Sequence, residues 1–229
     1  MLMAIKPKDM AKMIDHTYLK PTGRVEDIKK LCEEAREYEF ASVCIHPIFV
    51  PFAAKQLKES SVKITTVIGF PLGANTTETK AFETRNAIKN GAQEMDMVMN
   101  LSAFKSRAYD LVRSDIKSVV DSTNTAGVTS DIIVKVIIET CYLDDDEIVK
   151  ACELARDAGA DFVKTSTGFG TGNATTEDVS LMRKTVGRDL GVKASGGIRN
   201  FSDALDMLDA GANRIGTSSG VEIVTDEEE

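Results

Sequence analysis

Several residue types and patterns on which common protein classes depend are scarce in this sequence. Only two histidines are present, His16 and His46, and no group of His, Cys and Glu residues has the spacing of a catalytic zinc site. We therefore expect no metal ion and no metal-dependent mechanism. The four cysteines show no CxxC spacing, and a chain of 229 residues can bury a full core without disulfide bonds.

Long apolar runs and blocks of basic residues are also absent. The longest apolar stretches have the length of a strand, and the first residues, MLMAIKPKDM, lack the apolar stretch of a signal peptide. The net charge is −8 and no Lys- or Arg-rich block stands out, which gives nucleic-acid binding little electrostatic support. We expect a cytoplasmic protein that has neither nucleic acid nor a membrane as a partner.

The composition is that of an ordinary soluble globular protein. Hydrophobic residues make up 42% and charged residues 28% of the chain, and 229 residues suit one domain. Because no linker or low-complexity segment divides the chain, we interpret residues 1–229 as a single domain. The acidic end, about residues 221–229, is expected to be a frayed tail.

Short β-branched or apolar runs alternate with longer segments of helical periodicity. A short first helix is expected within residues 6–13, and later helical segments cover residues 25–40, 76–91, 106–127, 144–159, 175–187 and 200–211. The eight strand candidates are residues 13–19, 41–46, 63–69, 94–100, 131–138, 160–165, 191–195 and 213–217. This order predicts an α/β fold, a TIM (β/α)8 barrel, and the apolar strands fit a parallel sheet covered on both sides. An open, doubly wound sheet is the alternative.

Two lysines lie in apolar segments that end in small residues and glycine: Lys164 in DFVKTSTGFG and Lys193 in GVKASGGIR. Burial in an apolar strand disfavours the charged form of lysine, and a second nearby cation acts in the same direction. One of the two amines can then be neutral near physiological pH and form a Schiff base with a carbonyl substrate. The alternative for each lysine alone is that its ammonium group reaches water from a strand end.

Strand alternation predicts which side chains face the inside of such a barrel. Asp96 points inward if the bulky Met95 and Met97 face the helices. The same alternation predicts an inward set that comprises Asp96, Lys135, Lys164 and Lys193. A structural ion-pair network is the alternative explanation for Lys135, although three lysines would then face few inward acids.

Two more side chains are assigned by the same alternation. His16 has the opposite parity from Asp15, so it is expected to face the helices as a core residue. Cys44 shares a strand face with His46, and it either lines the pocket or packs in the core.

Glycine-rich segments follow the last three strand candidates, at residues 168–173, 195–200 and 216–220. Glycine lets backbone amides approach an anion, and barrels commonly bind phosphate after strands seven and eight. We therefore predict a phosphate site there, whereas tight turns alone are the alternative. The GFGTG segment lacks the third glycine of a dinucleotide fingerprint, since Asn173 occupies that position. We expect no cofactor.

Seven segments together resemble the deoxyribose-phosphate aldolase family, with a match from about residue 14 to residue 220: IDHTYLKP, GFPLGANTTETK, EMDMVMN, VKVIIET, FVKTSTGFG, VKASGGIR and RIGTSSG. The resemblance implies a class I aldolase on a TIM barrel. Such an enzyme cleaves 2-deoxyribose 5-phosphate to glyceraldehyde 3-phosphate and acetaldehyde, in deoxyribonucleotide catabolism. The implied partners are a sugar phosphate and aldehydes, and we expect a homo-oligomer.

The resemblance also implies roles for individual residues. Lys164 is the Schiff-base lysine, Lys193 is the cation that lowers its pKa, and Asp96 is the acid/base residue of the proton relay. Asp15 and Lys135 match pocket-lining positions. The positions that shape the substrate and phosphate site are Thr167, Gly168, Gly196, Gly197, Gly216, Ser218 and Ser219.

This sequence departs from some relatives at two places. It lacks the C-terminal tyrosine that some members use in proton transfer, and Phe169 stands where some members carry a lysine that contacts phosphate. Two alternatives to the implied function remain. One is another Schiff-base barrel of the transaldolase or pyruvate-aldolase type, and the other is a sugar-phosphate-binding barrel without activity. Borohydride trapping with acetaldehyde would distinguish the binding barrel from an active aldolase, because the binding barrel would gain no covalent mass.

Overall fold

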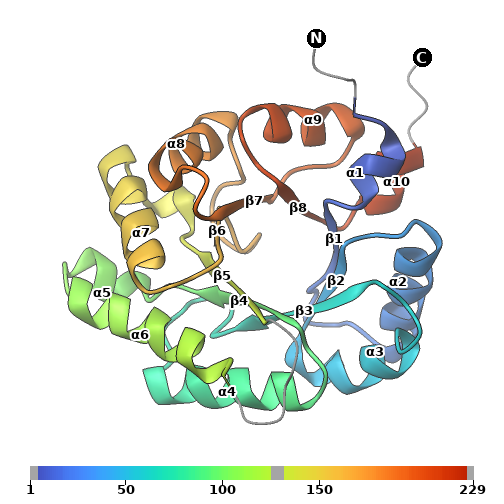
Figure 1. Ribbon diagram of the computed structural model, residues 1–229, viewed down its shortest axis with the longest axis horizontal. Helices are drawn as coiled ribbons and strands as arrows, with labels where there is room; N and C mark the ends of the chain where they lie inside the picture. The colour runs from blue at the N-terminus through green and yellow to red at the C-terminus, as the bar shows by residue number, and fades with distance from the viewer. Residues whose placement is uncertain (1–4, 125–131, 226–229) are drawn as a thin grey trace.

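A computed structural model describes residues 5–124 and 132–225 and contains a closed barrel of parallel strands (Figure 1). Each strand pairs with the next along the chain, and the last pairs with the first. The strands are β1 (Ile14–Tyr18), β2 (Ser42–Ile45), β3 (Lys63–Ile68), β4 (Glu94–Val98), β5 (Ile133–Ile137), β6 (Phe162–Lys164), β7 (Gly191–Ser195) and β8 (Arg214–Thr217). The barrel prediction is therefore confirmed, and the open sheet is wrong.

Helices surround the barrel as an outer ring (Figure 1). They are α1 (Pro7–Ala11), α2 (Val25–Glu37), α3 (Val50–Gln56), α4 (Thr77–Lys89), α5 (Leu101–Lys105), α6 (Tyr109–Ser122), α7 (Asp145–Asp157), α8 (Thr176–Val186), α9 (Phe201–Asp209) and α10 (Gly220–Thr225), with 3-10 turns at Pro47–Phe49 and Thr140–Tyr142.

Local sequence explains where several helices begin. The Thr175 side chain accepts a hydrogen bond from the Asp178 amide and caps α8, as expected from the sequence. At α7, the Asp144 carboxylate accepts from the Glu147 amide, and the Glu147 side chain accepts from the Asp144 amide. None of the helices within residues 5–124 and 132–225 is long and apolar enough to cross a membrane.

The expectation of a frayed acidic tail is wrong for residues 221–225, which lie in α10. Gly220 and Ile223 are buried, and α10 packs beside α1, so the first and the last of the described helices lie side by side (Figure 1). Burial of apolar area outweighs the acidic composition of this segment. Residues 226–229 and the expected strand residue 131 lie outside the described residues. Helices α3 and α5 were not predicted.

Strand alternation divides the barrel into an apolar outer layer and a polar interior. Met95 and Met97 are fully buried in the core between the strands and the helices. His16 is also on this side, as predicted, and its Nε2 atom lies 2.8 Å from a Glu34 carboxylate oxygen on α2. Each fully buried methionine or leucine contributes roughly 1.5–3 kcal/mol of transfer free energy.

One buried ion pair joins two helices to the end of β4. The Lys80 amine on α4 donates to Asp115 on α6 at 2.5 Å and to the Val98 carbonyl at 3.0 Å. Both side chains are almost completely inaccessible, and Thr77 donates a further hydrogen bond to Asp115. Because Val98 lies two residues after Asp96, this pair holds the strand that carries Asp96 against the helical layer.

We expect Lys80→Met to lower the free energy of unfolding by about 3–5 kcal/mol, because it leaves the Asp115 carboxylate buried without its cationic partner. Urea denaturation measures the change. The control is Lys117→Met on α6, whose pair with Asp121 has both side chains more than half exposed, so stability should stay nearly unchanged. Equal small losses in both variants would contradict the importance of the buried pair.

Candidate active site

Seven charged side chains from six strands meet inside the barrel. They are carried by β1, β4, β5, β6, β7 and β8, and most of them have no accessible surface. Four are cationic and three are anionic: Lys135, Lys164, Lys193 and Arg214, with Asp15, Glu94 and Asp96.

Asp96 lies at the centre of this network. Its Oδ2 atom accepts hydrogen bonds from Lys164 Nζ at 2.8 Å and from Lys193 Nζ at 2.7 Å. Its Oδ1 atom accepts from Lys135 Nζ at 2.9 Å. Lys193 Nζ also donates to Asp15 at 2.5 Å. The structure therefore brings together all four residues of the predicted inward set and adds Asp15.

The lower part of the network contains two residues that sequence reasoning missed. Arg214 Nη1 donates to Asp15 Oδ1 at 2.7 Å and to Glu94 Oε2 at 2.9 Å, and Lys135 pairs with Glu94 at 2.5 Å. The expectation that three lysines would face few acids is thus wrong. The same alternation that assigned Asp96 predicts Glu94 two residues earlier, and it places Arg214 on the face of Gly216.

Charge balance favours one neutral lysine in this network. With every group ionised, four positive charges face three negative charges, so loss of one proton leaves three of each. An unbalanced charge is costly in a buried site, because water does not screen it.

The groups around each lysine indicate which one loses the proton. Burial, reinforced by the nearby Lys193 charge, lowers the pKa of Lys164 in spite of the opposing effect of Asp96. Burial alone would also lower the pKa of Lys193, but its contacts with Asp15 and Asp96 outweigh that effect and raise it. Burial would raise the pKa of Asp96, and the three lysines hold it well below its ordinary value. Lys164 is therefore the candidate neutral amine.

A cavity of about 1000 Å³ lies where the strands end. Lys164 borders it with a side chain that is 4% exposed, whereas the side chains of Lys135 and Lys193 are 0% exposed. Most predicted site residues line this cavity, namely Lys164, Thr167, Gly168, Gly196, Gly197, Gly216, Ser218 and Ser219. The others are buried beneath it: Asp15, Cys44, Asp96, Lys135 and Lys193.

Cys44 packs inside the barrel in a small apolar cluster with Leu19 and Val67. Burial raises the pKa of its thiol, because the thiolate would be poorly solvated there. The packing alternative for Cys44 therefore agrees with the structure.

Glycine is required at several positions around the cavity. Gly196 and Gly197 have φ values of 91° and 80°, a region that other residues seldom adopt. A Cβ atom on Gly216 would lie 2.9 Å from Lys193 Cε, so this glycine leaves room for the Lys193 side chain. Gly216 therefore contacts the charged network as well as the cavity.

Glu139, at the end of β5, holds the loop that follows β6. Its carboxylate accepts hydrogen bonds from the Thr167 amide at 3.0 Å and from the Thr167 hydroxyl at 2.5 Å. The same hydroxyl accepts from the Phe169 amide at 3.0 Å. Glu139 itself has a φ of 57°, a left-handed conformation that costs a non-glycine residue roughly 1–3 kcal/mol. The buried carboxylate therefore fixes one wall of the cavity.

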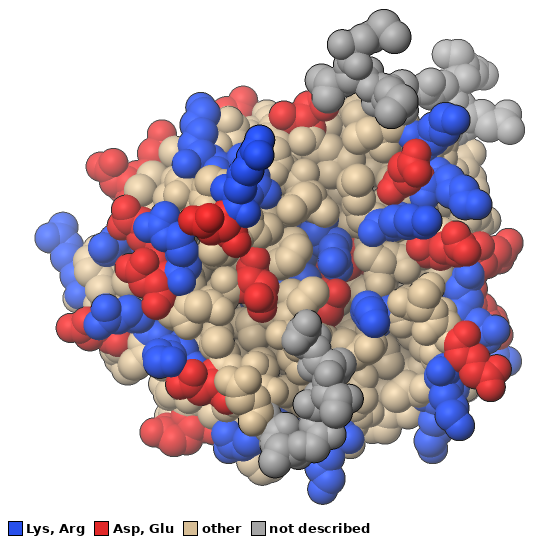
Figure 2. Space-filling model, in the orientation of Figure 1, with Lys and Arg blue, Asp and Glu red and all other residues tan. Residues whose placement is uncertain are grey.

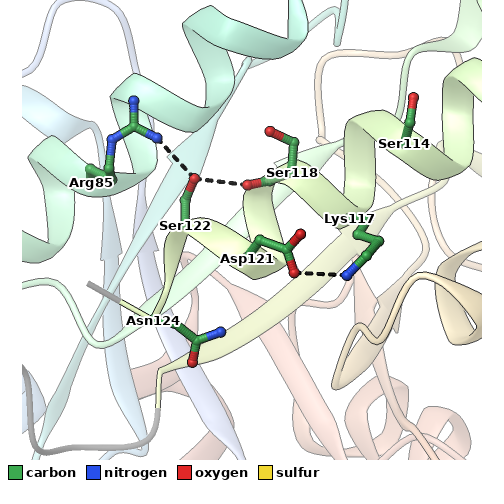
Figure 3. Close-up of a pocket in the computed structure, with 7 residues that line it drawn as sticks. All are labelled: Arg85, Ser114, Lys117, Ser118, Asp121, Ser122 and Asn124. Carbon is green, nitrogen blue, oxygen red and sulfur yellow. Dashed lines mark hydrogen bonds and ion pairs between the residues drawn. The ribbon is translucent and has the colours of Figure 1, made fainter. Parts of the chain in front are cut away.

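A second hollow lies outside the barrel between α4 and α6 (Figure 3). Arg85 points toward Ser122 and donates to it, while Lys117 pairs with Asp121 on the same helix (Figure 3). Because these charged groups already have partners, we assign no chemistry to this hollow. Within residues 5–124 and 132–225, no group of three or more His, Cys, Asp and Glu side chains is arranged to hold a metal ion.

Lysine and arginine side chains alternate with acidic ones around the rim of the face that Figure 2 shows, and others lie near its centre, inside the ring of helices (Figure 2). On this face the described residues form no extended region of one charge sign.

The chain is similar to known aldolases in sequence and in fold. The chain matches a family model described as "DeoC/LacD family aldolase" over residues 9–225. It is 62% identical to a deoxyribose-phosphate aldolase of Caldanaerobacter subterraneus subsp. tengcongensis over 216 residues, which cover 94% of this chain and 92% of that protein. It is 61% identical to a deoxyribose-phosphate aldolase of Streptococcus sanguinis, with 95% and 96% covered.

Solved structures of similar sequence share the fold. The structure described as "QR15, an Aldolase" superposes with a TM-score of 0.89 at 44% identity and covers 95% of both chains. A deoxyribose phosphate aldolase from Aeropyrum pernix, described as a unique tetrameric structure, has a TM-score of 0.87 at 35% identity, with 96% of this chain and 91% of that chain covered.

We expect Glu139→Ala to increase the amide hydrogen-exchange rate of Thr167 by roughly tenfold, because the amide loses its buried acceptor. Mass spectrometry of peptides that span residues 165–169 measures the change. Glu139→Gln is the control, since its side-chain carbonyl can still accept from the amide. Unchanged exchange in the alanine variant would show that the loop holds its conformation without Glu139.

Proposed function

This chain belongs to the DeoC/LacD family of aldolases, and from that premise we propose that it is a class I aldolase. It reversibly cleaves 2-deoxy-D-ribose 5-phosphate to D-glyceraldehyde 3-phosphate and acetaldehyde, a reaction of deoxyribonucleotide catabolism. The observation that carries the proposal is the position of Lys164. Of the three lysines in the charged network, it alone borders the cavity, and it has a lowered pKa.

The first half of the reaction forms a covalent bond between Lys164 and the sugar. Neutral Nζ attacks the C1 aldehyde carbon of the open-chain sugar, and the carbinolamine loses water to give an iminium. Asp96 Oδ2, 2.8 Å from Nζ, is placed to take the proton that the nitrogen releases on addition. Lys193 stays protonated and favours the neutral form of Lys164.

The second half breaks the bond between C2 and C3. A base removes the proton of the C3 hydroxyl, the C2–C3 electrons move toward the iminium nitrogen, and glyceraldehyde 3-phosphate leaves. The remaining enamine takes a proton at C2, and hydrolysis then releases acetaldehyde and free Lys164. We assign Asp96 as the group that exchanges these protons, through Lys193 or a bound water, since it contacts both lysines.

The phosphate site is proposed at the loops after β7 and β8. Gly196, Gly197, Ser218 and Ser219 line the cavity there, and the two glycines have backbone conformations that leave amides open to an anion. Thr167 and Gly168 line the cavity after β6, the strand that neighbours β7. In this proposal the phosphate lies at the loops after β7 and β8 and the reacting carbon lies at Lys164.

We also propose that the chain forms a homo-oligomer and works in the cytoplasm. Ile48, Leu72 and Phe82 are large apolar side chains with more than half of their surface exposed, which gives a partner copy apolar area to cover. All four cysteines are free, as expected for a reducing compartment. Light scattering after size-exclusion chromatography tests the oligomeric state, and a monomer at micromolar concentration would reject it.

The purified chain is expected to release acetaldehyde from 2-deoxyribose 5-phosphate, and Lys164→Arg should lower kcat/KM by roughly four orders of magnitude or more. Arginine keeps a cation beside Asp96 but cannot form the iminium. A coupled assay for the two aldehyde products measures the rate. The exposed Lys117→Met variant should keep full activity. Release of pyruvate from a keto acid, with none from the deoxy sugar, would favour a different Schiff-base aldolase.

Lys193→Leu should raise the pH midpoint for adduct formation, because removing a cation stabilises the protonated form of Lys164. A charge a few ångströms away shifts a pKa by up to roughly three units at an effective dielectric near 20. The midpoint is read from borohydride trapping with acetaldehyde across a pH series. Lys193→Arg, which keeps the charge, should move it much less. An unshifted midpoint in the leucine variant would reject the electrostatic role.

Ser218→Asp should raise KM for 2-deoxyribose 5-phosphate strongly and change KM for unphosphorylated deoxyribose much less, because the new carboxylate repels the phosphate. Some loss of kcat is also expected, since binding of the remote phosphate helps to position the reacting carbon. Ser218→Ala serves as the neutral control in steady-state kinetics. If the two substrates suffered equally, the phosphate would bind elsewhere.

A further inference from the structure

Arg214 and Glu94 lie beneath the reacting groups, away from the cavity, and form an ion pair with each other. Neither residue lines the cavity, and their side chains are 14% and 3% exposed. Arg214 Nη1 bridges two carboxylates, at 2.7 Å from Asp15 Oδ1 and 2.9 Å from Glu94 Oε2. The Arg214 guanidinium also stacks over the Phe162 ring, 5.6 Å from its centroid. Its position is therefore fixed from two sides.

Each carboxylate beneath the site connects this arginine to a lysine above it. Asp15 accepts from Arg214 through Oδ1 and from Lys193 through Oδ2. Glu94 Oε2 pairs with Arg214, with Lys135 at 2.5 Å and with the Thr65 hydroxyl at 3.1 Å. Both lysines then meet Asp96. Two continuous chains of ion pairs thus run from Arg214 to the oxygens of Asp96.

The proton occupancy of Lys164 depends on every charge around it. Asp96 on β4 favours its protonated form, whereas Lys193 on β7 opposes it, and Cys44 on β2 also faces it. Behind these groups lie Lys135 on β5 and Asp15 on β1, at 3.6 Å from one another. Arg214 and Glu94 lie farther from the cavity than these groups, and they complete the network of four cations and three anions.

We propose that Arg214 and Glu94 are positioning residues that act on Lys164 through the network, as opposed charges that set how readily its amine loses a proton. This proposal rests on the proposed function, in which Lys164 must be neutral to attack the substrate. Arg214 adds the positive charge that makes the network release a proton, and it also neutralises Asp15 and Glu94. Glu94 opposes it and keeps Lys135 protonated.

The two residues should therefore shift the reactivity of Lys164 in opposite directions. Arg214→Met removes a positive charge, so the pH midpoint for adduct formation on Lys164 should rise by roughly one unit. Glu94→Gln removes a negative charge and keeps the shape of the side chain, so the midpoint should fall by a similar amount. The double variant has the same net charge in the network as the unsubstituted chain, so its midpoint should lie close to that of the unsubstituted chain.

The test uses the full chain, borohydride and acetaldehyde across a pH series, with the adduct quantified on the Lys164 peptide by mass spectrometry. Since neither residue borders the cavity, KM for the sugar phosphate at a pH above the midpoint should change less than twofold. Circular dichroism identifies folded variants, and Arg214→Gln replaces Arg214→Met if that variant does not fold. Arg214→Lys keeps the charge and should leave the midpoint almost unchanged.

Midpoints that move in opposite directions and cancel in the double variant support the proposal. Shifts in the same direction, or no shift in either single variant, overturn it. A loss of packing alone would not shift the midpoint in a direction that depends on the sign of the charge removed. An unsubstituted chain that forms no adduct on Lys164 would instead reject the proposed function, on which this inference depends.

Discussion

One carboxylate oxygen, Asp96 Oδ2, accepts hydrogen bonds from two lysine amines, and the rest of the site depends on this shared contact. Lys164 and Lys193 come from neighbouring strands whose register places the two residues directly opposite one another. If no carboxylate lay between them, the ammonium groups of these two lysines would repel each other strongly in a buried site. Asp96 lets both lysines stay inside the barrel, and the network around it decides which of them stays charged.

The same contact separates the roles of two chemically identical side chains. Lys193 pairs with two carboxylates and has no accessible surface, whereas Lys164 pairs with one carboxylate and borders the cavity. An extra carboxylate stabilises the ammonium form, and burial with fewer partners favours the amine. In the proposed mechanism, the difference between nucleophile and neighbouring cation thus follows from position in the barrel, because the residue type is the same.

Most of the fold and the central part of the site could be predicted from the sequence, because strand alternation is a strong constraint. Short β-branched or apolar runs between helical segments placed eight strands, and strand parity placed Asp96, Lys135, Lys164 and Lys193 inside the barrel. Helix α3 was not predicted; it carries Pro51 in its first turn, a position that proline suits. Helix α10 was not predicted because the acidic composition of about residues 221–229 indicated a tail. The burial of Ile223, which holds this helix, is visible only in the structure.

The remaining parts of the site depend on contacts between residues far apart in the chain. Glu94 and Arg214 have the inward parity, but their importance comes from pairing across 120 positions of the sequence. Glu139 adopts a left-handed backbone conformation that local sequence does not favour for glutamate, and its bonds to Thr167 hold it there. Local patterns indicate which side chains face inward, and only the closed barrel shows which of them meet.

The most direct test of the central claim is to locate the covalent adduct. The chain is incubated with acetaldehyde and borohydride and then digested, and the peptides are mapped by mass spectrometry. The arrangement around Asp96 predicts a reduced adduct on Lys164 and none on Lys135 or Lys193. An adduct mainly on Lys193, or the absence of any adduct from this network, would contradict the assignment of Lys164 as the neutral, accessible amine.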